Sequence, residues 1–120
     1  MSLDVYLTRQ KMVSYDKGKT FLEEEETVYD ANITHNLGKM AREADIYKAL
    51  WLPEELNITK AKDLIPLLEK GFADLKNRPE YFKKFNSPNG WGMYEHFLPF
   101  VEKYLNACIE YKEADVYASR

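Results

Sequence analysis

The spacing of apolar residues changes at Ile33, and this change limits what the chain can fold into. Near the N-terminus, Leu3, Val5 and Leu7 alternate with other residues, a period of two that predicts a half-buried strand. From Ile33 onward the apolar spacing is three or four, which predicts one face of a helix that ends before Pro53. This helical stripe consists of Ile33, Leu37, Met40, Ala44, Tyr47 and Trp51. The chain therefore combines strands with helices.

The residues between these two patterns predict a β-hairpin. Residues 16–19 (DKGK) are typical of a turn. Residues 27–29 (TVY) are rich in strand-forming side chains and predict the second strand. The four glutamates at Glu23–Glu26 are interpreted as a solvated face or a mobile loop, with an interaction tail as the alternative.

Two more long helices and a last strand are expected after Pro53. Because proline is tolerated in a first helical turn, Pro66 favours Asp63 as the N-cap of the second helix. The third helix covers residues 94–108, where Pro99 is expected to kink the helix or to mark its start. Residues 115–119 (DVYAS) predict a strand that pairs with the first strand.

Strands at both ends of the chain with helices between them predict an α+β fold. The expected architecture is a small antiparallel sheet, made of the N-terminal hairpin and the C-terminal strand, with about three main helices on one face. A length of 120 residues predicts a single domain that spans residues 1–120. A chain of this size can bury enough surface to fold without disulfides or metals.

Charge and cysteine content restrict the partners and the compartment. The formal net charge of −3 argues against binding to long nucleic acids, which requires a basic face. Cys108 is the only cysteine, so no intramolecular disulfide can form and a reducing compartment is expected. The N-terminal residues lack a basic region and a long apolar run, so we expect neither a signal peptide nor a membrane span, and a cytoplasmic protein.

The first candidate site lies where the first helix is expected to begin. Either Asn32 or Thr34 is expected to cap this helix, and such a terminus can bind an anion. On a helix that starts there, His35, Lys39 and Arg42 share one surface away from the apolar stripe. Together with Asn36 at the border of that stripe, these side chains would suit a phosphate or a carboxylate. An ordinary capped helix start is the alternative.

The second candidate site is the segment 89–96 (NGWGMYEH). Gly90 and Gly92 allow the backbone to approach another group closely and leave the Trp91 indole free to stack. Trp91 and Tyr94 could hold a base or another planar ring between them. The alternative interpretation, which composition favours, is that Trp91 closes the open end of an aromatic core.

Other kinds of chemistry find little support in the sequence. The spacing of His35, His96, Asp30 and Glu95 matches no metal motif, so no metal is expected. No nucleophile motif and no glycine-rich phosphate loop is present, and no cofactor is expected. A function as a simple hydrolase or lyase that uses His35 or His96 remains an alternative.

Three blocks together resemble a family of small uncharacterised proteins from bacteriophages and prophages. The blocks are residues 32–41 (NITHNLGKMA), 47–55 (YKALWLPEE) and 89–101 (NGWGMYEHFLPFV), and the resemblance extends from about residue 27 to Arg120. It implies a setting in the cytoplasm of a bacterial host. It implies no activity and no catalytic residue, although small phage proteins of this size often counter host defences.

The leading hypothesis is a non-enzymatic binding protein of the phage type. It would take a small anionic or nucleotide-like ligand between the two candidate sites, and so counter a host defence. The first alternative is a protein-interaction module whose aromatic and acidic surfaces occupy a host protein. The second alternative is the hydrolase or lyase. No membrane partner is expected, and the sequence leaves the oligomeric state open, a homo-oligomer included.

Overall fold

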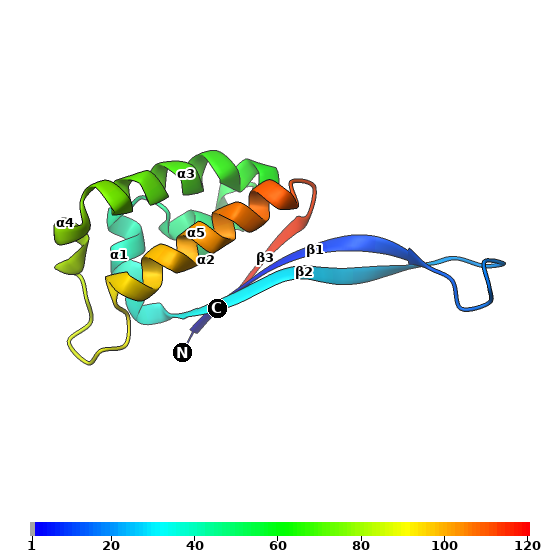
Figure 1. Ribbon diagram of the computed structural model, residues 1–120, viewed down its shortest axis with the longest axis horizontal. Coiled ribbons are helices and arrows are strands. Elements are labelled where there is room, and N and C mark those ends of the chain that lie inside the picture. The colour runs from blue at the N-terminus through cyan, green and yellow to red at the C-terminus, as the bar shows by residue number, and fades with distance from the viewer. Residues whose placement is uncertain (1) are drawn as a thin grey trace.

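A three-stranded antiparallel sheet forms one layer of the molecule, and the helices gather over one side of it (Figure 1). The computed structural model describes residues 2–120. The strand order in space is β2-β1-β3, so β1 is the central strand. The strands are β1 (Ser2–Val13), β2 (Leu22–Thr34) and β3 (Asp115–Ser119). The predicted α+β fold, with an N-terminal hairpin and a C-terminal strand in one sheet, is confirmed.

Two long helices, which the short helix α4 connects, dominate the helical layer, and the other short helices lie between β2 and the first of them. The α-helices are α1 (Gly38–Glu43), α2 (Tyr47–Trp51), α3 (Ala61–Asn77), α4 (Pro79–Lys83) and α5 (Tyr94–Glu110). Two 3-10 helices, η1 (His35–Leu37) and η2 (Pro53–Leu56), lie beside α1 and α2. Among residues 2–120, no helix has the length and apolar character needed to cross a membrane.

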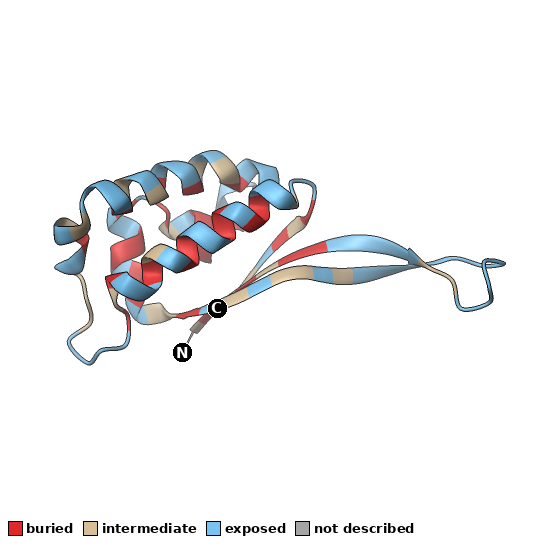
Figure 2. Ribbon diagram, viewed as in Figure 1, coloured by how far each residue is buried: buried red, intermediate tan, exposed pale blue. Residues whose placement is uncertain are grey.

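The hydrophobic core lies between the sheet and the helices (Figure 2). Leu3, Val5 and Leu7 of β1 have no exposed surface, and the same holds for Phe97 and Val101 of α5. Burial of each such side chain contributes about 1.5–3 kcal/mol relative to an exposed position. The period of two in β1 and the helical period in α5 therefore both identify core positions.

The prediction of one long helix from Ile33 to Trp51 was wrong. Residues up to Thr34 continue β2, because they pair with the start of β1 from Ser2 onward. The helical part that follows is interrupted at Asp45, whose φ of 60° is left-handed. This break turns the chain so that Ile46 is buried against the helix α3. The burial of Ile33 predicted from the stripe is nevertheless observed, on a strand.

Of the two interpretations of Glu23–Glu26, the solvated face is observed, because Glu23, Glu24 and Glu25 are exposed, and the mobile loop was wrong. These glutamates belong to β2 and pair in register with Arg9–Met12 of β1. A local signal could not show this, because a run of identical charges has no alternation between apolar and polar residues. The turn predicted at residues 16–19 is present, with the Asp16 carboxylate accepting from the N–H groups of Lys19 and Thr20.

The start of α3 differs from the prediction as well, whereas the start of α5 agrees with the helix predicted from residue 94. Helix α3 begins at Ala61, and Asp63 lies in its first turn rather than at the N-cap. The Ala61 N–H donates to the Ala114 carbonyl at 2.9 Å, so backbone close to β3 replaces a side-chain cap. Helix α5 begins at Tyr94, and Pro99 lies inside it.

Candidate functional site

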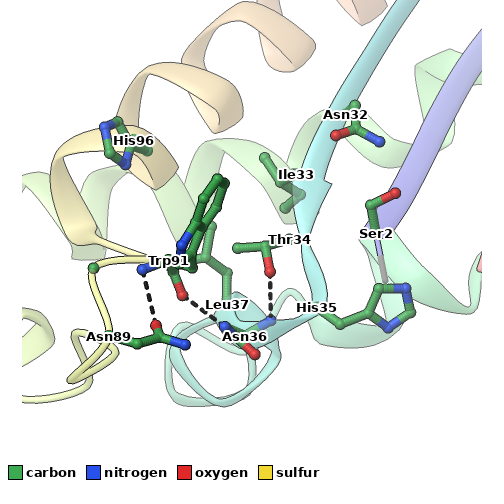
Figure 3. Close-up of a pocket in the computed structure, with 12 residues that line it drawn as sticks. Ser2, Asn32, Ile33, Thr34, His35, Asn36, Leu37, Asn89, Trp91 and His96 are labelled. Carbon is green, nitrogen blue, oxygen red and sulfur yellow. Dashed lines mark hydrogen bonds between the residues drawn. The ribbon is translucent and has the colours of Figure 1, made fainter.

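A cavity of about 980 Å³ lies between the end of β2 and the loop that precedes α5 (Figure 3). Its volume is at the upper end of the range of small-molecule sites. Residues from both sequence-predicted segments line it, together with Ser2 at the start of β1. The lining residues are Ser2, Asn32, Ile33, Thr34, His35, Asn36, Leu37, Asn89, Gly90, Trp91, Gly92 and His96.

Hydrogen bonds fix the backbone of Trp91 from two sides. The Asn36 side chain donates its amide N–H to the Trp91 carbonyl at 2.8 Å. On the other side, the Trp91 N–H donates to the Asn89 side-chain oxygen at 2.9 Å. A turn closes the same loop, because the Gly90 N–H donates to the Ser87 carbonyl at 3.2 Å. Trp91 is therefore positioned before any ligand arrives.

Gly92 allows the loop to approach Asn36 closely. Its φ of 115° lies in a region that side chains disfavour, and a methyl group there would lie 2.8 Å from Asn36 Cβ. Gly90 also has a positive φ, of 80°, but a methyl group there would meet no atom within 4 Å. The two glycines thus share the backbone requirement and differ in the space around them.

We expect Gly92→Ala to destabilise the protein by about 1–3 kcal/mol more than Gly90→Ala. Both variants place a side chain on a backbone with a positive φ, which destabilises the folded state. Only Gly92→Ala also forces Asn36 and the loop apart. Urea unfolding followed by far-ultraviolet circular dichroism measures the difference. Equal losses in the two variants would show that the loop has room to move away from Asn36.

The Trp91 indole is 70% exposed, so it does not close the core. The interpretation that composition favoured, a Trp that seals the open end of the core, was wrong. Figure 3 shows the indole extending from the loop along one wall of the cavity. Because the backbone is anchored while the ring is free, the indole can stack on a planar group.

Tyr94 does not form the second half of a sandwich around a ring. Its side chain is buried, and its hydroxyl donates to the Leu75 carbonyl at 2.7 Å. As the first residue of α5, it is directed into the core while Trp91, three residues earlier, stays outside. Of these two rings, only that of Trp91 is therefore available for stacking in the cavity.

The two basic residues of the predicted anion site are not among the lining residues. The Lys39 ammonium lies 5.4 Å from the centre of the Phe85 ring, and the Arg42 guanidinium lies 3.9 Å from the centre of the Tyr47 ring. The prediction assumed that a helix begins at Asn32. Strand β2 instead continues to Thr34, so the side chains of the later residues point in other directions than expected. The six residues of α1 also align few peptide dipoles, so the helix start attracts an anion weakly.

Four predicted residues from the end of β2 and from η1 do line the cavity, and each is already partly engaged. The Asn32 amide donates to an Asp4 carboxylate oxygen at 2.6 Å. Thr34 caps η1, because its hydroxyl accepts from the Asn36 N–H at 3.3 Å. The His35 ring lies edge-on to the Trp51 indole with 6.1 Å between ring centres. This packing holds the wall of the cavity to the core.

His35 carries a polar atom without a partner. Its Nε2 atom is buried and has no hydrogen-bond partner among residues 2–120. Buried polar atoms of this kind are uncommon because they lose their interaction with water. Because this nitrogen is buried, a ligand in the cavity would contact it only if the neighbouring residues moved.

Ser2, Asn89 and His96 also line the cavity; the sequence reasoning did not include Ser2, and it placed Asn89 and His96 in the segment 89–96 without assigning either a role in ligand binding. Ser2 reaches the site because it pairs with Thr34 across the sheet, which no local pattern reveals. No sequence pattern identifies Asn89 as the acceptor that holds Trp91. The exposed His96 lies on the first turn of α5, close to the loop.

The described lining residues include no Asp, Glu, Lys or Arg. Amides, hydroxyls and two imidazoles supply the polar atoms, and the indole supplies the apolar surface. In the part of the chain that the structure describes, no group of three or more His, Cys, Asp or Glu side chains is placed to hold a metal ion. The cavity is therefore suited to a polar, largely uncharged molecular surface.

Comparisons of the chain with protein-family models, curated proteins and solved structures found no match.

Proposed function

We propose that the protein binds, without transforming it, a small ligand that has a planar, hydrogen-bonding ring such as the base of a nucleotide. One observation carries this proposal: an indole that is 70% exposed stands at the wall of a cavity of about 980 Å³, on an anchored backbone. Stacking of a base on an aromatic side chain contributes about 1–3 kcal/mol of binding free energy.

The fixed geometry of the loop supports binding. Asn36 and Asn89 hold the Trp91 backbone in place, so a ligand does not have to order this segment when it binds. The edge of a base carries donors and acceptors, and the amides, hydroxyls and imidazoles of the lining offer both kinds of partner.

The absence of fixed charge among the described lining residues specifies which part of a nucleotide is recognised. Lys39 and Arg42 point to other rings, so a phosphate would find no fixed positive charge in this lining. We propose that the ring provides most of the affinity and that the phosphates extend toward solvent. This differs from the anion site that the sequence suggested, where the phosphate would have dominated.

The resemblance to phage and prophage proteins supports a biological role for such binding. We propose that the protein sequesters a nucleotide signal in the cytoplasm of a bacterial host and thereby counters a host defence. Sequestration requires affinity rather than turnover, which suits a cavity built from amides and an anchored indole.

Calorimetric titration and thermal shift with adenosine, guanosine, their 5′-monophosphates and inorganic phosphate test the binding. We expect at least one nucleoside or nucleotide to raise the Tm of the wild type, because a ligand that binds only the folded state stabilises it. Trp91→Ala should weaken that binding by about tenfold or more through the loss of stacking. Tyr15→Ala is the matched control, since Tyr15 is 68% exposed and is not among the lining residues.

Three results would contradict the proposal. The first is that no nucleoside or nucleotide binds, and the second is that inorganic phosphate binds as well as the nucleotides. The third is that chromatography of the same mixtures shows a converted ligand, which would favour a hydrolase or lyase. For the biological role, expression of the wild type should restore plaque formation by a phage that a nucleotide-signalling defence restricts, and Trp91→Ala should not.

A further inference from the structure

The distal part of the hairpin, residues 9–13 and 22–27 with the turn between them, projects away from the rest of the protein (Figure 1). We call this segment the arm. Strand β3 pairs with β1 only as far as Thr8, where the register between β1 and β2 also shifts. The molecule measures 59 Å along its longest axis, against 27 and 23 Å along the others. Within the described sheet, therefore, β1 and β2 continue along the arm without the third strand, and Arg9 at the base of the arm lies over the Tyr111 ring.

The end of the arm exposes large apolar side chains. Met12 is 60% exposed, Tyr15 68%, Phe21 56% and Leu22 53%. A two-stranded hairpin is marginally stable in water, and exposed apolar groups of this size add no stability to it. Such a projection is typical of a surface that another molecule covers.

The two faces of the arm differ in how their charges are neutralised. Cross-strand partners share a face, so Arg9 and Lys11 lie with Glu24 and Glu26 on one face. On that face the Arg9 guanidinium lies 3.0 Å from a Glu26 carboxylate oxygen, and the Lys11 ammonium lies 3.9 Å from the other oxygen. The Tyr15 hydroxyl also donates to the Glu24 carboxylate. The charges of this face are thus largely satisfied within the arm.

The opposite face carries Glu23 and Glu25 without such neutralisation. Their cross-strand partners are Met12 and Gln10, which have no charge. Among residues 2–120, no basic side chain forms an ion pair with either glutamate. Two carboxylates beside an exposed methionine therefore face solvent.

The outer edge of β2 is also free within the described sheet, because β2 is the first strand in the order β2-β1-β3. We propose that this edge of the arm accepts an extended segment of a partner protein that carries lysine or arginine, as an added strand. Backbone hydrogen bonds would supply affinity, as in other cases of strand addition to a sheet edge. Basic side chains opposite Glu23 and Glu25 would supply specificity, because opposite charges across strands attract.

The same charges disfavour other occupants of the edge. A second copy that paired β2 with β2 would bring glutamates opposite glutamates. The strand β1 of a second copy would offer Arg9 and Lys11, but both already interact with Glu26 of their own hairpin. A nucleic acid or an anionic membrane would be repelled by the unneutralised carboxylates.

Fluorescence anisotropy with a labelled short peptide of alternating lysine and valine tests this inference on the full chain. We expect this peptide to bind at low ionic strength and a peptide of alternating glutamate and valine not to bind. Glu23→Gln/Glu25→Gln should weaken binding by about five- to tenfold. Glu102→Gln/Glu110→Gln removes the same charge from exposed positions of α5 and should leave the affinity unchanged.

Amide hydrogen exchange provides a second readout that general charge attraction would not change. The bound basic peptide should slow exchange in residues 22–27, because an added strand engages the free backbone edge of β2. The proposal is overturned if the basic peptide does not bind, if the two double variants lose equal affinity, or if no amide of residues 22–27 is protected. A dimer in sedimentation whose residues 22–27 are already protected from exchange without the peptide would also overturn it.

Discussion

Trp51→Ala is expected to lower the free energy of unfolding by about 3–5 kcal/mol, the range for removal of a large buried ring. The Trp51 side chain is 1% exposed and is one of the largest fully buried groups in the protein. It stacks on Tyr47 with 5.0 Å between ring centres and also meets the edge of His35. Its removal would therefore leave a void that rigid neighbours on two elements cannot fill. Urea unfolding followed by circular dichroism measures the loss.

The second tryptophan is the matched control for this experiment. Trp91→Ala removes the same side chain from a position that is 70% exposed, and the Asn36 and Asn89 hydrogen bonds to its backbone remain. We expect a change within about 0.5 kcal/mol, as for most surface substitutions. Similar losses in the two variants would contradict the assignment of one ring to the core and the other to the cavity.

The parts of the fold that were predictable are those with a local signal. The alternation of Leu3, Val5 and Leu7 and the helical spacing from Tyr94 to Cys108 both follow from side chains that one element buries on one face. The pairing of residues 115–119 with β1 was also predictable, because a strand-like tail has to pair somewhere. The fold class follows from these elements.

The wrong predictions concern features that depend on distant residues. The length of β2 is set by its register with β1, and Glu23–Glu26 carry no pattern that reveals this. The break at Asp45 places Ile46 against Gly71, more than twenty residues later, so the helical stripe in the sequence hides it. Tertiary contacts decide the local conformation in both places.

The candidate site shows the same division. Asn32, Thr34, His35, Asn36 and Trp91 line the cavity, since they stand at the junction where the strand becomes a helix and at the loop that reaches this junction. The positions of Lys39 and Arg42 were predicted from the angle between successive residues of a helix that starts at Asn32, and this helix begins later than predicted. Lys39 and Arg42 therefore contact Phe85 and Tyr47 instead. Tyr94 begins α5 as predicted, but its ring is buried and its hydroxyl donates to the Leu75 carbonyl.

The stability of the protein is expected to fall steeply above about pH 9, in part because Cys108 is buried. This thiol has no exposed surface on α5, and burial raises its pKa from 9.0 to about 12. Between these values the unfolded chain releases a proton that the folded chain retains, so rising pH favours unfolding. The contribution of this thiol to the free energy of unfolding is constant below pH 9. It decreases by up to about 1.4 kcal/mol for each pH unit above pH 9. Over the whole interval the loss approaches about 4 kcal/mol.

Cys108→Ala separates the thiol from the other groups that titrate at high pH. Burial raises the pKa of Tyr104 and of Tyr29 as well, so their contributions have the same sign but begin only above the ordinary tyrosine pKa of 10.0. Between pH 9 and 10 the thiol should therefore dominate the difference between the variant and the wild type. We expect urea unfolding of the variant to show a shallower decline in stability over this interval, and equal slopes for the two proteins between pH 7 and 8. An equally steep decline between pH 9 and 10 in both proteins would show that the folded state allows the Cys108 thiol to ionise as readily as the unfolded chain does.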